Sequence, residues 1–115
     1  MASRNPTKAS VFDAEKHLKI EYSTEAYRDL VAINQFGNAN FGRKQSLAYE
    51  SKLRHAVELI SQYPSMARLR TELKNPVRVY PVASHLIVYK VHADVVVIIR
   101  ILSGRQDLPA ELNEI

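Results

Sequence analysis

The stretch from Val77 to Leu102, VRVYPVASHLIVYKVHADVVVIIRIL, decides the fold. It holds three runs rich in β-branched and aromatic residues, Val77–Val82, His85–Val91 and Val95–Leu102, which are separated by short links. Such runs are typical of consecutive antiparallel strands. The last run is apolar on both faces, as a covered central strand is, whereas Pro81 has no N–H for the ladder and favours an edge or a bulge. We therefore expect a three-stranded meander.

Before the meander the apolar spacing becomes helical. In Ser23–Phe36 the first residue suits an N-cap, and Glu25 lies in the first turn. The glycines and asparagines of residues 37–42 predict that this helix ends there and the chain reverses. A second apolar stripe from about Lys44 to Tyr63 predicts another helix, which stops before Pro64. The two helices should form an antiparallel hairpin.

One more strand is predicted at His17–Tyr22, where polar and apolar residues alternate. The resulting order, β-α-α-β-β-β, is that of an α+β domain in which a helical hairpin packs on one face of a mostly antiparallel four-stranded sheet. The other face should be partly open. The length of 115 residues fits one domain, which we place at residues 17–109. A flexible lead-in (1–16) and a polar tail (110–115) flank it.

Composition excludes several classes of function. The chain has no cysteine, so disulfides, thiolate metal sites and cysteine nucleophiles are excluded, and the cytoplasm is the default location. Its apolar runs are far shorter than the ~20 residues of a membrane helix. The first residues lack the apolar core of a signal peptide. The four histidines are scattered without ligand-like spacing, so we expect no metal site.

The formal net charge of +4 is concentrated in the middle of the chain, because residues 43–78 hold eight Lys or Arg against three acids. A basic surface favours anionic partners, either nucleic acid or an acidic protein, and charge alone does not choose between them. The chain carries no nucleic-acid motif such as a zinc finger or an RNP sequence.

Three segments resemble the RelE/ParE superfamily of toxins, on its ParE side. These are YSTEAYRDL at Tyr22–Leu30, RVYPVASHLIVYKV at Arg78–Val91 and ILSGRQDLP at Ile101–Pro109, and the likeness extends over about Leu18–Pro109. The second segment is the most specific, because an Arg, an aromatic residue, a Pro, and then His, an aliphatic pair and Tyr follow the ParE pattern.

The resemblance implies a toxin of a type II toxin–antitoxin system that is neutralised by a cognate antitoxin, whose C-terminal segment folds on binding. For the ParE branch it implies DNA gyrase as the target, protein–protein contact without direct nucleic-acid binding, no cofactor and a hetero-oligomer with the antitoxin. RelE-type members instead cut messenger RNA on the ribosome, so the fold does not settle the activity. A binding module that keeps this fold without toxicity is a third possibility.

The residues favour a binding protein over a nuclease, and we assign no catalytic residue. RNA cleavage needs a proton acceptor, a proton donor and cations near the phosphate. After Leu102 there is no Tyr or His, and Ser103 stands where related chains often carry His. Arginine is a poor general base because it stays charged. Only His85 and His92 remain as nearby groups that titrate near neutral pH.

Eight residues of the meander and its flanks are candidates for target or antitoxin binding. Arg78 and Tyr80 share strand parity and would form a stacking surface, or else the arginine stem packs on the ring and stays solvated. His85 suits a structural histidine at the meander turn better than a catalytic one. Arg100 interrupts an apolar strand and needs a partner, either Asp107 or an antitoxin carboxylate; an Arg105–Asp107 pair is the other conservative choice. The full set is Arg68, Arg70, Arg78, Tyr80, His85, Arg100, Arg105 and Asp107.

Overall fold

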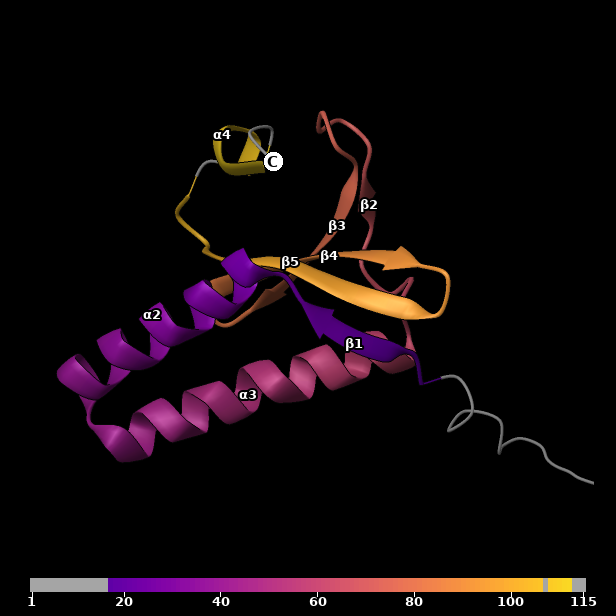
Figure 1. Cartoon of the computed structure of the whole chain (residues 1–115). Coiled ribbons are helices and arrows are strands. Elements are labelled where there is room, and N and C mark those ends of the chain that lie inside the picture. Colours follow the sequence, from indigo (N-terminus) through magenta and orange to yellow (C-terminus); the bar gives the residue numbers. More distant parts are fainter. Residues whose placement is uncertain (1–16, 107, 113–115) are drawn as a thin grey trace, which may run out of the picture.

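The computed structural model describes residues 17–106 and 108–112 (Figure 1). Their elements, in chain order, are β1 (Lys19–Tyr22), α2 (Thr24–Phe41), α3 (Arg43–Gln62), β2 (Leu69–Arg70), β3 (Val77–Val82), β4 (His85–His92), β5 (Val95–Ser103) and α4 (Leu108–Leu112). The predicted α+β class and helical hairpin are confirmed. The predicted lead-in at 1–16 lies outside the described residues, and the predicted domain boundary at 109 falls inside α4.

The sheet has five strands in the order β1-β5-β4-β3-β2. The predicted meander is present, since β3, β4 and β5 pair antiparallel in sequence, and β1 adds to the far side of β5 in parallel. The strand missing from the sequence prediction is β2, which pairs with the first two residues of β3. A strand of two residues is too short for its alternation of polar and apolar side chains to be recognised in the sequence. Pro81 lies in the part of β3 that β2 does not pair with, where β3 forms the edge of the sheet. An edge position suits proline, because it has no N–H to donate.

Ser23 caps α2 as predicted. Its hydroxyl accepts a hydrogen bond from the N–H of Ala26 at 3.0 Å and donates to the carbonyl of Ile99 in β5 at 2.7 Å. The first bond satisfies a backbone donor that has no partner inside the helix. The second fixes the start of α2 beside β5.

The end of α2 lies five residues later than the sequence suggested. Helix α2 continues through Gly37 to Phe41, and the reversal takes place at Gly42, where φ is +86°. The glycine at 37 serves packing instead, because a Cβ there would lie 2.8 Å from the hydroxyl oxygen of Ser46 in α3. The two helices thus approach closely at this point. None of the described helices is long and apolar enough to cross a membrane.

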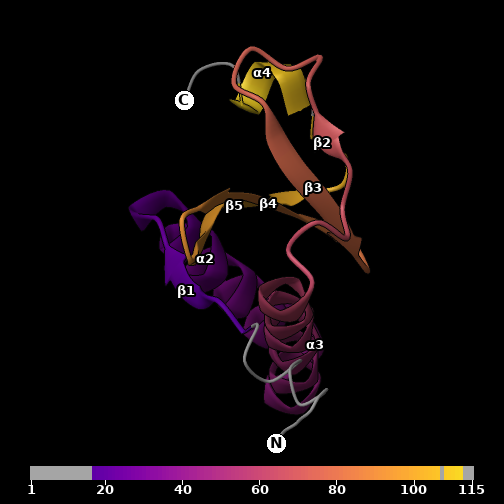
Figure 2. The same ribbon diagram turned by 90° about the vertical axis from the view of Figure 1, so that its right-hand side faces the viewer.

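Two cores lie on opposite faces of the sheet. The helical hairpin covers one face, and α4 with the segment before β3 covers part of the other (Figure 2). The main core joins Ala26, Leu53 and Ile60 of the helices to Ile87, Tyr89, Val96 and Ile98 of the sheet. The second core holds Leu73, Val77, Val88, Leu102 and Leu112. The face expected to be partly open is therefore covered at one end by the C-terminal helix.

Candidate functional site

A β-bulge sets the direction of Arg100. The pairing of β4 with β5 shifts register between Val88 and Tyr89, so that Ile99 is passed over between Ile98 and Arg100. A bulge bends its strand and redirects the side chains next to it. Arg100 accordingly reaches toward α2, although its neighbours are the buried Ile101 and the partly buried Ile99.

Arg100 binds Asp29 of α2 through both carboxylate oxygens. Its Nε and Nη2 donate to Asp29 at 2.9 and 3.1 Å, and the backbone N–H of Ile101 donates to the same carboxylate at 2.8 Å. Bidentate charge-assisted pairs of this kind are among the stronger hydrogen bonds in proteins. The sequence pointed instead to Asp107, which lies outside the described residues. Asp29 was not among the suggested partners.

The environment of Arg100 stabilises the charged form of its guanidinium group. The side chains of Arg100 and Asp29 are only 20% and 16% exposed, and Glu111 of α4 lies 3.8 Å from the guanidinium. The hydrogen bonds to Asp29 raise the pKa of Arg100 above its ordinary value, although burial acts in the opposite direction. This arginine therefore joins α2, β5 and α4, and its donors are largely engaged within the chain.

Arg68 lies just before β2 and Arg70 lies on it, and both are near Glu72. Arg70 donates to the carboxylate of Glu72, and Arg68 lies 3.8 Å from the same group. The hydrogen bond from Arg70 lowers the pKa of Glu72. Exposed pairs of this type contribute little stability, because water screens them. The two arginines remain accessible, with their charge partly offset by one acid.

Arg78 and Tyr80 follow on β3. The guanidinium of Arg78 donates to the carbonyl of Ala67 and so fastens β3 to the segment that follows α3. Tyr80 is partly buried and packs against the main core. Both side chains thus take part in the packing of the fold.

His85 stands at the start of β4 and is held from α3. The hydroxyl of Tyr49 lies 2.6 Å from its Nδ1 and also accepts a hydrogen bond from the backbone N–H of Ser84 at 3.1 Å. The Tyr49 hydroxyl therefore accepts from Ser84 and shares a second hydrogen bond with Nδ1, in which the imidazole tautomer decides which of the two atoms donates. Burial lowers the pKa of His85, while the charge of Asp29 acts more weakly to raise it. The predicted role of His85 at the meander turn agrees with these contacts.

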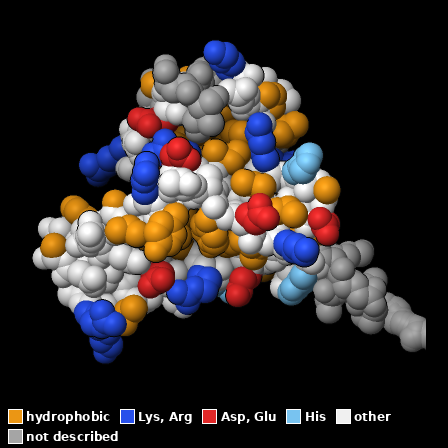
Figure 3. Space-filling view, in the orientation of Figure 1, with side chains coloured by type: hydrophobic (Ala, Val, Ile, Leu, Met, Phe, Trp, Pro, Cys, Tyr) orange, Lys and Arg blue, Asp and Glu red, His pale blue; other side chains and the backbone are white. Residues whose placement is uncertain are grey.

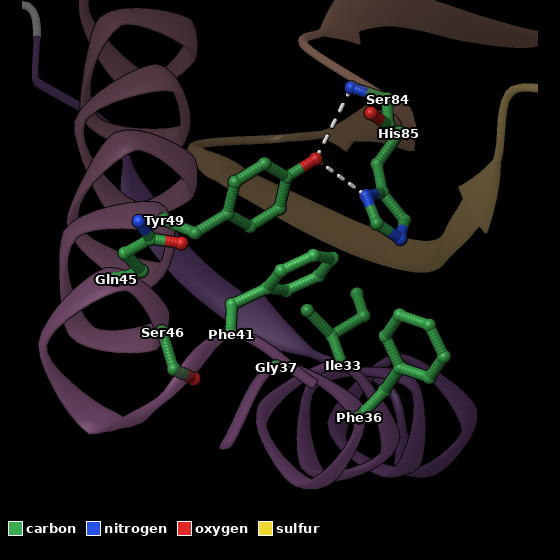
Figure 4. A pocket seen from close by; sticks show the side chains of 9 residues that line it. All are labelled: Ile33, Phe36, Gly37, Phe41, Gln45, Ser46, Tyr49, Ser84 and His85. Atoms are coloured by element: carbon green, nitrogen blue, oxygen red, sulfur yellow. Dashed lines mark hydrogen bonds between the residues drawn. The ribbon is translucent and has the colours of Figure 1, made fainter. Parts of the chain in front are cut away.

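One hollow of the described chain lies between the helical hairpin and the β3–β4 turn. We call it the hairpin groove; its volume is about 390 Å³. Its lining comprises Ile33, Phe36, Gly37 and Phe41 of α2, Gln45, Ser46 and Tyr49 of α3, and Ser84 and His85 of the turn (Figure 4). In Figure 4 the ring of Tyr49 crosses from α3 toward the turn, and the ring of Phe41 projects between Tyr49 and Ile33.

A second hollow, of about 670 Å³, adjoins the groove and shares Ile33, Phe36, Ser84 and His85 with it. Arg105, in the turn after β5, lines this second hollow. The structure therefore brings together two of the predicted residues, His85 and Arg105. The other described candidates line neither hollow.

The sequence pattern missed the aromatic residues of the groove. Phe36 had been placed in the apolar stripe of its helix, and Phe41 in a loop, yet both rings are about 60% exposed. The sequence did contain a signal for them. Phe36 and Phe41 are large apolar residues beside a predicted chain reversal, where a side chain has few core residues to contact. Tyr49 as the partner of His85 could not be predicted, because the two residues are 36 positions apart.

The arrangement is that of a binding surface more than of a reaction centre. Four of the candidate cations bind acceptors within the chain: Arg68 and Arg70 lie near Glu72, Arg78 binds the carbonyl of Ala67, and Arg100 binds Asp29. Within residues 17–106 and 108–112, no three His, Asp or Glu side chains gather as metal ligands would. What the site offers is an apolar groove with a histidine in its wall and an arginine close by.

Comparison with known proteins identifies relatives of this chain by sequence. Residues 20–108 match the family described as ParE toxin of type II toxin-antitoxin system, parDE. Toxin ParE3 of Caulobacter vibrioides is 31% identical over 75 residues, which cover 65% of this chain and 75% of the relative.

A solved structure described as the chromosomal ParDE TA system from P. aeruginosa has the same fold. Its TM-score is 0.66 at 19% identity, with 76% of this chain and 97% of that chain covered. At that identity the likeness concerns the fold alone. The family match, by contrast, extends over most of the chain and contains both helices and the whole meander. The chain therefore belongs to the ParE toxin family of type II toxin–antitoxin systems.

Proposed function

We propose that this toxin inhibits DNA gyrase by protein–protein contact and that a cognate antitoxin neutralises it. The observation that carries the proposal is that its candidate arginines are already engaged: the guanidinium groups of Arg78 and Arg100 bind acceptors within the chain, and Arg68 and Arg70 share Glu72. A phosphate-cleaving site needs cations that converge on one position. A surface that binds a protein has no such requirement.

A second candidate function is the messenger RNA endonuclease activity of the RelE type. The observation in its favour is that His85 and Arg105 line the same hollow. Against it, Nδ1 of His85 is engaged by Tyr49, and Ser103 supplies no imidazole near the end of β5. The Nε2 atom alone would have to take and return protons, without a second acid–base group among the residues that line the hollow.

Direct binding of nucleic acid is not part of the proposal. On the face drawn in Figure 3, Lys and Arg side chains are interspersed with Asp and Glu, and hydrophobic side chains lie between them. Proteins that bind nucleic acid through its phosphates present clustered cations instead. A protein partner fits this mixed surface better. Gyrase as the target would place the toxin in the cytoplasm, and inhibition by contact would need no cofactor.

Two assays with the purified wild-type chain test the proposal. The first measures DNA supercoiling by purified gyrase during titration with the toxin, with a check for trapped cleaved DNA. The second measures messenger cleavage in a reconstituted translation reaction. We expect inhibited supercoiling and intact messenger.

Cleaved messenger with unaffected gyrase would contradict the proposal and support the nuclease. In that case His85→Gln should abolish cleavage, with Tyr27→Phe, an exposed position at the start of α2, as the control. If neither assay responds and induction of the chain does not arrest growth, the fold serves as a non-toxic binding module.

A further inference from the structure

The face of the sheet opposite the helical hairpin is only partly covered by α4 (Figure 2). In the paired strands β1 and β5, Ile20, Val96 and Ile98 contribute to the main core. Successive side chains of a strand point to opposite faces, so the residues between them point away from the hairpin. The residues of β4 that pair with them complete this open surface. We call it the outer face; it comprises Lys19, Glu21, Lys90, His92, Val95 and Val97.

The strand β5 departs from the pattern that a sheet shows on a face in contact with water. Such strands normally alternate apolar residues on the core side with polar residues on the other side. The strands β1 and β4 follow this rule, because their residues on the outer face are Lys, Glu and His. In β5 the outward residues are Val95 and Val97, which are partly exposed and belong to neither core. The centre of the outer face is therefore apolar without a packing partner among the described residues.

The pairing of β1 with β5 also indicates a missing layer. These two strands are parallel. Parallel sheets are normally buried on both faces. The helical hairpin supplies one layer, but α4 reaches only the far end of β5, where Ile99 and Leu102 pack with Leu112. The start of β5 lacks a second layer within residues 17–106 and 108–112.

The outer face has the anatomy of a surface that binds a folded protein. Its apolar centre on β5 lies between polar margins on β1 and β4, as the apolar core of a protein interface lies within a polar rim. On the right of Figure 3, over these strands, hydrophobic side chains lie among Lys, acidic and His side chains. A segment that folds on binding uses a groove or a free strand edge instead. The hollow that reaches this face at Lys90 and Ile99 has a volume of about 100 Å³, too small for a helix about 10 Å across.

The two margins of the outer face differ in charge. The β4 margin carries Lys90 and His92, and Lys90 forms no ion pair with a carboxylate of the described residues. The β1 margin carries Lys19 and Glu21, which offset each other. A partner is therefore favoured that places an acidic side chain over the β4 margin.

We propose that the outer face is the surface with which the toxin contacts its target protein, with apolar side chains of the target on Val95 and Val97 and a carboxylate on Lys90. A surface built on paired strands is formed before the target arrives, so binding does not include the cost of ordering it. The assignment rests on the proposed function, since it takes gyrase as the target.

The first test measures the concentration of the full chain that half-inhibits DNA supercoiling by purified gyrase. The double variant Val95→Thr, Val97→Thr keeps both β-branched shapes and replaces a methyl group of each by a hydroxyl group. Lys90→Glu reverses the charge of the β4 margin. Each variant should raise the half-inhibiting concentration at least tenfold, because the target loses apolar contacts in the first and meets a like charge in the second.

Matched controls are Val31→Thr, at an exposed valine of α2, and Lys52→Glu, at an exposed lysine of α3. Neither residue lies on the sheet, so the half-inhibiting concentration should stay within twofold of the wild type. Circular dichroism during heating verifies that the variants fold, and Lys90→Glu decides alone if the double variant does not. Unchanged inhibition by the outer-face variants, or equal losses in the controls, would overturn the assignment.

A second test uses growth arrest on induction, which does not depend on the identity of the target. If the wild type arrests growth without inhibiting gyrase, and the outer-face variants no longer do so, the gyrase proposal fails and the outer face stands as the target surface. Variants that arrest growth like the wild type refute the outer-face assignment whether or not gyrase is inhibited. A wild type with neither effect contradicts both proposals.

Two other occupants of the outer face are distinguished by co-expression with the antitoxin and by sedimentation of the free toxin. Variants that keep growth arrest but no longer co-purify with the antitoxin would assign the face to the antitoxin. A wild-type dimer that dissociates in these variants, again with growth arrest kept, would assign it to a second copy of the chain. Either result overturns the assignment to the target; the expected result is an unchanged antitoxin complex and an unchanged sedimentation coefficient.

Discussion

Arg100, near the end of β5, and Arg105, in the turn that follows, are five residues apart, yet they have opposite surroundings. Arg100 is largely buried, and Asp29 accepts two of its hydrogen bonds while Glu111 lies nearby. Arg105 is exposed beside an apolar groove and forms no ion pair with the described residues. The first arginine holds three elements together, whereas the second is available to a partner. Composition alone does not distinguish basic residues that stabilise the fold from those that are available to a partner.

The largest effect is expected from breaking the Arg100 site. Asp29→Ala removes the acceptor of two guanidinium bonds and of the Ile101 N–H, and leaves a charge in a largely buried place. The free energy of unfolding in urea should fall by about 3 kcal/mol. Adding Arg100→Met should recover part of the loss, because the unpaired charge is then gone. A loss below about 0.5 kcal/mol would show that the Arg100–Asp29 pair does not stabilise the fold.

The next largest effect on stability is expected at the wall of the hairpin groove. Gly37→Ala places a methyl group 2.8 Å from the hydroxyl oxygen and 3.2 Å from the Cβ of Ser46, so the hydroxyl must rotate and the helices must shift slightly to accept it. Overpacking of this kind should lower the free energy of unfolding by about 1–3 kcal/mol. Asn38→Ala, at the exposed neighbouring position, is the control and should not destabilise the fold. An unchanged stability of Gly37→Ala would mean that the hairpin adjusts freely and that the groove is not rigid.

A smaller effect is expected at the link between α3 and the turn. Tyr49→Phe keeps the ring but removes the hydroxyl that binds Ser84 and His85. The loss should be about 1 kcal/mol in thermal or urea unfolding. Tyr27→Phe should change nothing, since that exposed hydroxyl forms no hydrogen bond with the part of the chain that the structure describes. If both variants behave alike, the link does not shape the groove.

The smallest effect is a dependence of stability on pH. Burial lowers the pKa of His85 below its ordinary value of 6.5, which it regains in the unfolded chain. When the pH falls below about 6.5, the unfolded chain binds a proton that the folded chain does not, so the fold loses stability until the pH passes the folded pKa. The charge of Asp29 acts in the opposite direction, and the Tyr49 hydroxyl and Arg105 are the other polar groups that face this site. His85→Gln should flatten the dependence in urea titrations between pH 7.5 and 5; an unchanged slope would assign it to other groups.

Much of the fold could be predicted because its signals are local. The N-cap at Ser23 and the period of two in the strands of the meander each depend on residues close in sequence. The prediction failed where tertiary contacts override local preference. Gly37 ended the predicted helix, but its close contact with Ser46 makes it part of a continuous one.

The site was less predictable, because its partners are distant in sequence. The residue that pairs with Arg100 lies 71 positions away on α2, and no pattern of spacing identifies it. The sequence did single out Arg100 as a charge that needs a partner, and His85 as the residue of the meander turn. It could not place Phe41 and His85 in the lining of one groove, since that arrangement depends on where the hairpin crosses the sheet.

The division between Arg100 and Arg105 is tested most directly by the free energies of unfolding of Arg100→Ala and Arg105→Ala, measured side by side in urea. We predict a loss of about 3 kcal/mol for the first variant and less than about 0.5 kcal/mol for the second. Equal losses, or a larger loss for Arg105→Ala, would contradict the view that one arginine holds the fold and the other is left free for a partner.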